Sequence, residues 1–140
     1  MQIQPYLFFE GRAEEALEFY RKALGAQVLM MMKNREAPEK PQFQVPADKV
    51  MHACFQVGDS QVMASDGMCS GKPNFQGFAL SVPAKDAADA KAKFGALAEG
   101  GQVKMPLSET FFARSFGMVN DKFGVAWMVI AGPKNLQGAP

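Results

Sequence analysis

The segment at residues 5–30, PYLFFEGRAEEALEFYRKALGAQVLM, has the pattern of a strand, a helix and a second strand, and part of it occurs twice in the chain. The run GAQVLM at 25–30 returns as GGQVKM at 100–105. Phe19 stands six residues before the first run, as Phe94 stands six before the second. A pattern that recurs in this way predicts two units of the same structure within one chain.

The composition is that of a soluble globular protein. With 140 residues, of which 48% are hydrophobic and 21% charged, the chain is expected to form a single domain over residues 1–140. Fifteen basic and fourteen acidic residues give a formal charge of +1 without a basic stripe, so nucleic acid is not an expected partner. Because no apolar stretch has the length of a membrane helix and no secretion signal opens the chain, we expect no membrane partner and a cytoplasmic location.

The first unit, residues 1–66, is predicted to have the order βαβββ. Its helix, at residues 12–24, has a stripe of apolar residues at helical spacing, acidic residues in its first turn, basic residues in its last turn and Gly25 as its stop. Pro5 indicates either that the first strand lies at a sheet edge or that Pro5 stands at an end of the strand. Strands are expected at 2–9, 27–33, 50–57 and 61–65, with a loop at 34–47.

The second unit, residues 75–131, is predicted to repeat this order. Asp86 is suited to cap a helix at residues 86–98, which Gly100 and Gly101 would end. Strands are expected at 78–82, 102–105, 114–119 and 125–130. The last residues, 132–140, have no periodicity and are expected to form a loose tail.

Two βαβββ units in about 130 residues resemble the vicinal oxygen chelate superfamily, which includes glyoxalase I, extradiol dioxygenases and the bleomycin and fosfomycin resistance proteins. The closer resemblance is to its PhnB-like branch, also labelled a 3-demethylubiquinone 3-methyltransferase domain, although no glycine-rich nucleotide loop of a methyltransferase fold is present. The motifs that carry the resemblance are PYLFF at 5–9, EALEFY at 15–20, VMHA at 50–53, MASD at 63–66, ETFF at 109–112, FGMV at 116–119 and FGVAWM at 123–128.

The resemblance implies an α+β fold of the glyoxalase/bleomycin resistance/dihydroxybiphenyl dioxygenase type, in which two βαβββ units form cupped mixed sheets. It also implies a homodimer, which the apolar strand edge at residues 3–9 favours. Enzymes of the superfamily bind a metal through one ligand from the first strand and one glutamate from the last strand of each unit. Here the matching positions are Pro5, Ser65, Gly77 and Met128. None is a usual ligand of a divalent metal, so no cofactor and no stoichiometric transition metal between the units are predicted.

The remaining polar side chains are few. His52, the only histidine, is expected on a strand opposite Arg114 of the second unit, where it either faces a cleft or is a hydrogen-bonded structural residue. Glu109 either binds a ligand together with Arg114 or forms a surface ion pair with it. Cys54 is expected to be a small buried hydrophobic residue, and Cys69 brings the cysteine count to only two.

Two functions remain open from the sequence. The first is binding of a small apolar or amphipathic molecule in the cleft between the two units, lined by Met63, Phe112 and Met128, residues that are equally suited to a core. The alternative is a metal-dependent lyase, isomerase or dioxygenase with a relocated metal site around His52, Glu109 and Asp66, the last of which is also a candidate ligand-binding residue. The sequence identifies neither the ligand nor a reaction.

Overall fold

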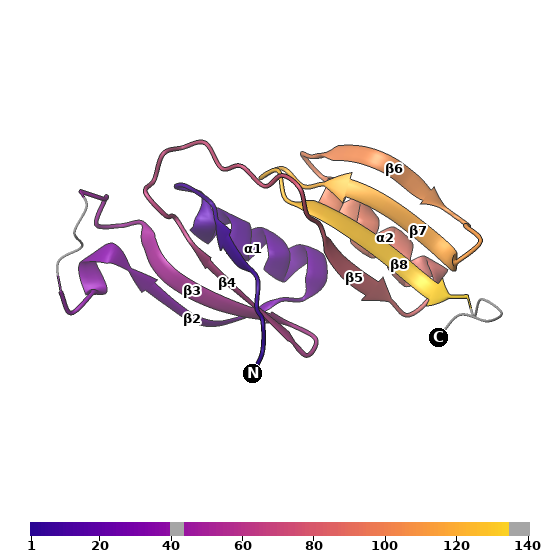
Figure 1. Ribbon diagram of the computed structural model, residues 1–140, viewed down its shortest axis with the longest axis horizontal. Coiled ribbons are helices and arrows are strands. Elements are labelled where there is room, and N and C mark those ends of the chain that lie inside the picture. The colour runs from indigo at the N-terminus through magenta and orange to yellow at the C-terminus, as the bar shows by residue number, and fades with distance from the viewer. Residues whose placement is uncertain (40–43, 135–140) are drawn as a thin grey trace. The chain divides into compact units, whose positions relative to one another are not determined.

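The structure of the protein, a computed structural model, describes residues 1–39 and 44–134. The chain divides into two compact units, Met1–Asn74 and Phe75–Pro140. Each unit contains one long helix and a four-stranded mixed sheet, as Figure 1 shows. The predicted pair of βαβββ units is therefore confirmed.

Unit 1 has the sheet order β1-β4-β3-β2, in which β1 and β4 are parallel and the other neighbours are antiparallel. Strand β1 is an edge strand of this sheet, as Pro5 indicated. The elements of unit 1 are β1 (Tyr6–Phe8), α1 (Ala13–Leu24), β2 (Gln27–Lys33), the short 3-10 helix η1 (Asn34–Glu36), β3 (Val50–Val57) and β4 (Ser60–Ser65).

Unit 2 repeats the arrangement with the order β5-β8-β7-β6, again with its first and last strands parallel. Asp86 caps the helix as predicted, since its Oδ1 accepts a hydrogen bond of 2.7 Å from the Asp89 N–H. The elements of unit 2 are β5 (Leu80–Ala84), α2 (Ala87–Ala98), β6 (Gln102–Ser108), β7 (Ala113–Asn120) and β8 (Ala126–Pro133).

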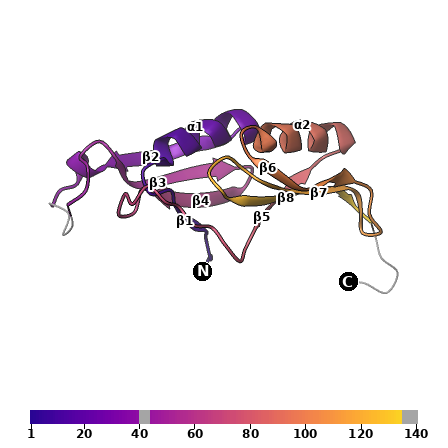
Figure 2. The ribbon, with the colours of Figure 1, turned by 90° about the horizontal axis from the view of Figure 1, so that it is seen from above.

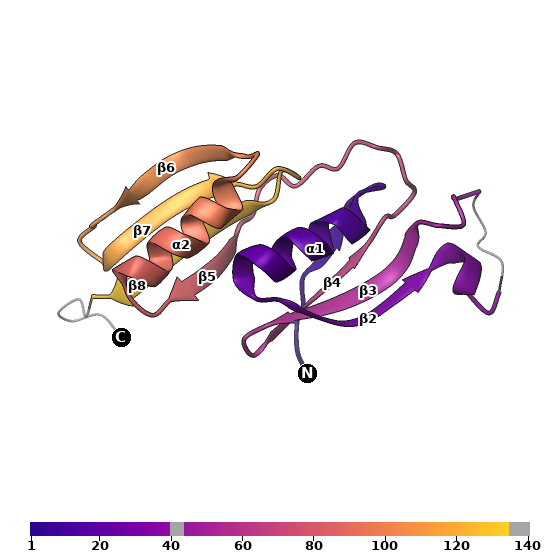
Figure 3. The same cartoon turned by 180° about the vertical axis from the view of Figure 1, so that it is seen from behind.

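In each unit the helix covers one face of its own sheet (Figures 2 and 3). Tyr20 of α1 is fully buried and stacks on Phe55 of β3, with ring centroids 5.6 Å apart. Burial of a side chain of this size contributes about 1.5–3 kcal/mol. In unit 2, Phe94 and Leu97 of α2 are buried in the same way. Because side chains alternate along a strand, every second residue points to the opposite surface of the sheet, which we call the helix-free face.

Several boundaries differ from the predictions. Strand β1 begins only at Tyr6, because Pro5 has no N–H to donate, although its carbonyl accepts a 2.9 Å hydrogen bond from the Met63 N–H. Strand β8 continues to Pro133, two residues into the segment expected to be loose, while residues 135–140 lie outside the described residues. Within residues 1–39 and 44–134, neither helix is long and apolar enough to cross a membrane.

Candidate functional site

The strand pairing shows which residues of the two units correspond. Residues 27–30 and 102–105 belong to the repeated sequence and end at Met30 and Met105. From each of these methionines, cross-strand pairing can be followed over three strands of the sheet. In unit 1 the cross-strand partners are Met30, Cys54 and Met63. In unit 2 they are Met105, Met118 and Met128. The ladders therefore align β3 with β7 and β4 with β8.

This alignment corrects the expected position of His52. His52 lies two residues before Cys54 and so corresponds to Phe116, which lies two residues before Met118; the expected match with Arg114 is wrong. The prediction aligned the sequence VGD at 57–59 with VND at 119–121. These two turns differ in length, because β3 and β4 are joined by two residues and β7 and β8 by five. The longer turn therefore shifted the predicted partner of His52 by two residues, from Phe116 to Arg114.

The strand pairing also changes which last-strand residues correspond at the superfamily's metal positions. Met128 corresponds to Met63, whereas Ser65 corresponds to Ile130, so the two expected last-strand positions are not equivalent. Neither pair supplies an imidazole, thiolate or carboxylate donor. In the part of the chain that the structure describes, no three histidine, cysteine, aspartate or glutamate side chains converge as metal ligands.

His52 is half-buried on β3 and belongs to an aromatic cluster on the helix-free face of unit 1. The Tyr6 hydroxyl lies 2.8 Å from His52 Nδ1, within hydrogen-bond distance, and the two rings are 5.6 Å apart. Tyr6 also stacks on Phe8, with ring centroids 4.9 Å apart. Phe8 is 50% exposed, so the cluster offers an apolar surface beside one polar pair. Tyr6 and Phe8 were not predicted as site residues, although their i, i+2 spacing on β1 gives them a common face.

Asp66 is fully buried and bonds to the backbone. Its Oδ1 accepts hydrogen bonds from the Gly11 N–H at 2.9 Å and the Ala13 N–H at 2.7 Å, and its Oδ2 accepts one from the Val50 N–H at 2.7 Å. Arg12, at the N-cap, makes no side-chain cap, so Asp66 satisfies the first turn of α1 from a distant point in the sequence. This carboxylate therefore joins α1, β3 and β4.

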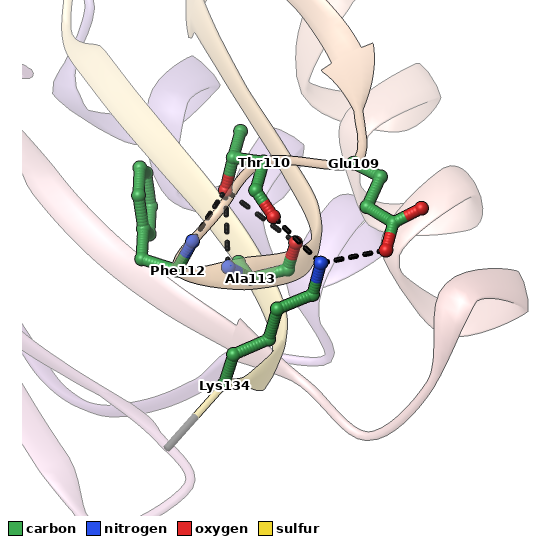
Figure 4. A network of polar contacts seen from close by, with 5 residues as sticks. All are labelled: Glu109, Thr110, Phe112, Ala113 and Lys134. Atoms are coloured by element: carbon green, nitrogen blue, oxygen red, sulfur yellow. Dashed lines mark hydrogen bonds and ion pairs between the residues drawn. The ribbon is translucent and has the colours of Figure 1, made fainter. Parts of the chain in front are cut away.

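Glu109 pairs with Lys134, as Figure 4 shows. Lys134 Nζ donates to Glu109 Oε2 at 2.6 Å and to the Thr110 carbonyl at 2.8 Å. The hydrogen bond from Lys134 is the main cause that holds the pKa of Glu109 below its ordinary value, and the charge of Arg114 is the smallest. Because the Glu109 side chain is 68% exposed, the pair is screened by water and stabilises the fold little.

The other candidates in unit 2 are apolar or exposed. Phe112 is half-buried and meets Phe116 edge to face, with centroids 5.0 Å apart, and meets Phe111 at 5.2 Å. Met128 on β8 is half-buried, as is Met63 on β4 of unit 1. Arg114 is exposed on β7.

The order of the elements and the two sheets define a fold class. Solved domains from Fulvimarina pelagi and Frankia sp. EAN1pec, named as a glyoxalase-related enzyme and a glyoxylase/bleomycin resistance protein/dioxygenase domain, share the fold at identities of 17% and 14%. The chain thus has the two-unit fold of glyoxalase/bleomycin resistance/dioxygenase domains.

The chain belongs to the PhnB-like family, because the family model described as 3-demethylubiquinone-9 3-methyltransferase matches residues 1–130. It is 41% identical to protein PA1353 from Pseudomonas aeruginosa, with a TM-score of 0.84 and coverage of 96% of this chain and 99% of that one. It is 36% identical to Protein YjdN of Escherichia coli, covering 92% and 94% of the two chains. A PhnB protein from Bacillus cereus, named as a putative 3-demethylubiquinone-9 3-methyltransferase, is 27% identical, with a TM-score of 0.79 and coverage of 94% and 100%.

Proposed function

We propose that this protein binds a small apolar or amphipathic molecule without transforming it. The observation that carries the proposal is the aromatic cluster on the helix-free face of unit 1, where Tyr6, Phe8 and His52 combine an apolar surface with one polar pair. Small-molecule sites commonly consist of an apolar lining and a few polar groups that orient the ligand.

The chemistry of the cluster suits an amphipathic ligand. The hydroxyl of Tyr6 and the imidazole of His52 can each donate or accept a hydrogen bond, so together they suit a ligand hydroxyl, carbonyl or carboxylate. Phe8 and Met63, both partly exposed, then offer a ring and a flexible thioether to the apolar part.

Unit 2 has candidate ligand-binding residues of its own. Phe112 and Met128 offer apolar surface of the same kind, and Arg114 and Glu109 carry exposed charges that suit an ionised group. The Asp66 carboxylate, by contrast, accepts hydrogen bonds from three backbone N–H groups, which does not support the alternative of a relocated metal site with this carboxylate.

A titration with the fluorescent amphipathic anion 8-anilinonaphthalene-1-sulfonate tests the proposal. The dye should bind the folded chain at one saturable site, and Tyr6→Phe and His52→Ala should each weaken binding about 3–10-fold, since each removes about one hydrogen bond. Met63→Ala should weaken it as well. Met68→Ala is the matched control, because Met68 is 54% exposed and lies in the loop after β4. Equal effects of Met63→Ala and Met68→Ala, or unaltered binding to both polar variants, would show that the dye binds elsewhere.

We also propose a homodimer in the cytoplasm. Strand β1 is an edge strand, its last residue Phe8 is 50% exposed and Ile3 is 97% exposed, which favours coverage by a second chain. Free Cys54 and Cys69 are typical of a reducing compartment. Light scattering after size-exclusion chromatography should give twice the monomer mass at micromolar concentration, and the monomer mass would contradict the dimer.

A further inference from the structure

The helix-free face of unit 1 carries a row of sulfur side chains. Met30 on β2, Cys54 on β3 and Met63 on β4 are successive cross-strand partners, and we call these three residues the sulfur row. The next pair of β2 and β3 that faces the same way is Met32 and His52, two residues away on each strand. Five of the side chains that bind soft metals thus lie in two adjacent rows of one sheet.

The pairing places the sulfur row on one surface. Ala53 and Phe55, which flank Cys54 on β3, are fully buried, and Phe55 packs against α1. Cys54 therefore points to the helix-free face, and its cross-strand partners share that direction. Cys54 and Met63 form a regular opposed pair, whose Cβ atoms lie about 4.5–5.5 Å apart. Met30 lies next to a register shift of β2 and is paired with Cys54, and its flexible side chain can reach the thiol from the other side.

We propose that the sulfur row is a binding site for a soft monovalent metal ion, Cu(I). Thiolate and thioether ligands favour Cu(I) over the harder divalent ions, and binding would release one proton from the Cys54 thiol. His52 supplies a further donor: when Nδ1–H donates to the Tyr6 hydroxyl, Nε2 keeps its lone pair. The site lies within one unit and uses none of Pro5, Ser65, Gly77 and Met128, so it differs from the superfamily's divalent site.

Unit 2 provides an internal comparison. Its equivalent row, Met105, Met118 and Met128, has a thioether in place of the thiol, and Phe116 stands where unit 1 has His52. Three neutral thioethers without an anionic donor bind a cation less tightly than a row containing a thiolate. The first tight equivalent of metal is therefore assigned to unit 1.

Two anaerobic measurements test the site. Competition with the Cu(I) indicator bicinchoninate gives affinity and stoichiometry, and Ag(I) titration of protein labelled with ¹³C at the methionine methyl groups shows which thioethers coordinate. We expect one tight ion per chain, with the methyl signals of Met30 and Met63 shifting first. Cys54→Ser should lower the affinity at least tenfold and Met30→Leu or Met63→Leu several-fold, while Met128→Leu and Cys69→Ser should leave it unaltered.

Several results would overturn the proposal. If only Cys54→Ser lowers the affinity and the methyl signals of Met30 and Met63 stay in place, the ion binds a thiol alone. If Cys69→Ser or Met128→Leu abolishes binding of the tightly bound ion, the site lies elsewhere. If the protein does not compete with bicinchoninate for Cu(I), it has no such site. The substituted methionines are partly exposed, so the variants should fold, which circular dichroism checks. The dye titration of Tyr6→Phe is independent of this result, so the two proposals can fail separately.

Discussion

Removal of the Asp66 carboxylate should destabilise unit 1 without a direct effect on the proposed binding of a small molecule. Asp66→Ala leaves two buried donors, the N–H groups of Ala13 and Val50, without an acceptor. Each such donor costs about 1–3 kcal/mol, so the free energy of unfolding should fall by about 2–6 kcal/mol. Asp66→Asn keeps an oxygen for the Ala13 N–H but turns an amide group toward Val50. The asparagine variant should therefore lose about half as much free energy of unfolding as the alanine variant.

Urea unfolding provides the measurement. Circular dichroism follows both units, whereas the single tryptophan, Trp127, is buried in unit 2 and reports on that unit. The control is Asp59→Ala, which removes an exposed carboxylate from the turn between β3 and β4 and should alter stability by less than about 0.5 kcal/mol. If Asp66→Ala proves as stable as Asp59→Ala, or if the asparagine variant loses as much as the alanine variant, the capping account of Asp66 is wrong.

Two further predictions concern backbone conformation and charge. Gly25 ends α1 at φ 68°, so Gly25→Ala should destabilise the protein by about 1–2 kcal/mol in urea unfolding. Gly95 lies within α2, and apart from the backbone of that helix no atom lies within 4 Å of an added Cβ, so Gly95→Ala should stabilise it by about 0.8–1 kcal/mol. Effects of the same sign would contradict this. Because Lys134 holds the pKa of Glu109 below 4.5, the stabilisation from the pair is present above that pH and is lost as pH falls through the lower folded value. Lys134→Ala should bring the pKa, followed by carboxyl NMR, back up toward 4.5, and an unaltered titration would assign the shift to another group.

The sequence predicted the helices better than the strand registers. Helix α1 starts at Ala13 and ends at Leu24, within one residue of the predicted bounds, because a stripe at helical spacing and a glycine stop are both local signals. The register of a strand is the set of residues with which it pairs on its neighbour. A turn of different length can shift this register without a signal in the sequence of the strand itself. The two-residue error at His52 arose in this way.

The role of Asp66 could not be predicted from its neighbours. It accepts from Ala13, 53 residues away in the sequence, so no local motif connects the two. An indirect signal exists, because Arg12 stands at the N-cap of α1 without a side-chain cap, and a helix start that lacks one needs acceptors from elsewhere. In unit 2, where Asp86 supplies a local cap, the helix start was predicted together with its cap.

The aligned units also indicate where the polar chemistry of this protein lies. The outer members of the sulfur row have methionine at both equivalent positions, as Met30 with Met105 and Met63 with Met128 show. Differences fall on β3 and β7, where unit 1 has Cys54 and His52 and unit 2 has Met118 and Phe116. The methionines of both units suit apolar contact. At these paired positions, only unit 1 adds a thiol and an imidazole to its helix-free face. Ligand selectivity that depends on a hydrogen bond or a soft donor should therefore respond to substitutions in unit 1, whereas substitutions at Met118 or Met128 should alter apolar contact alone.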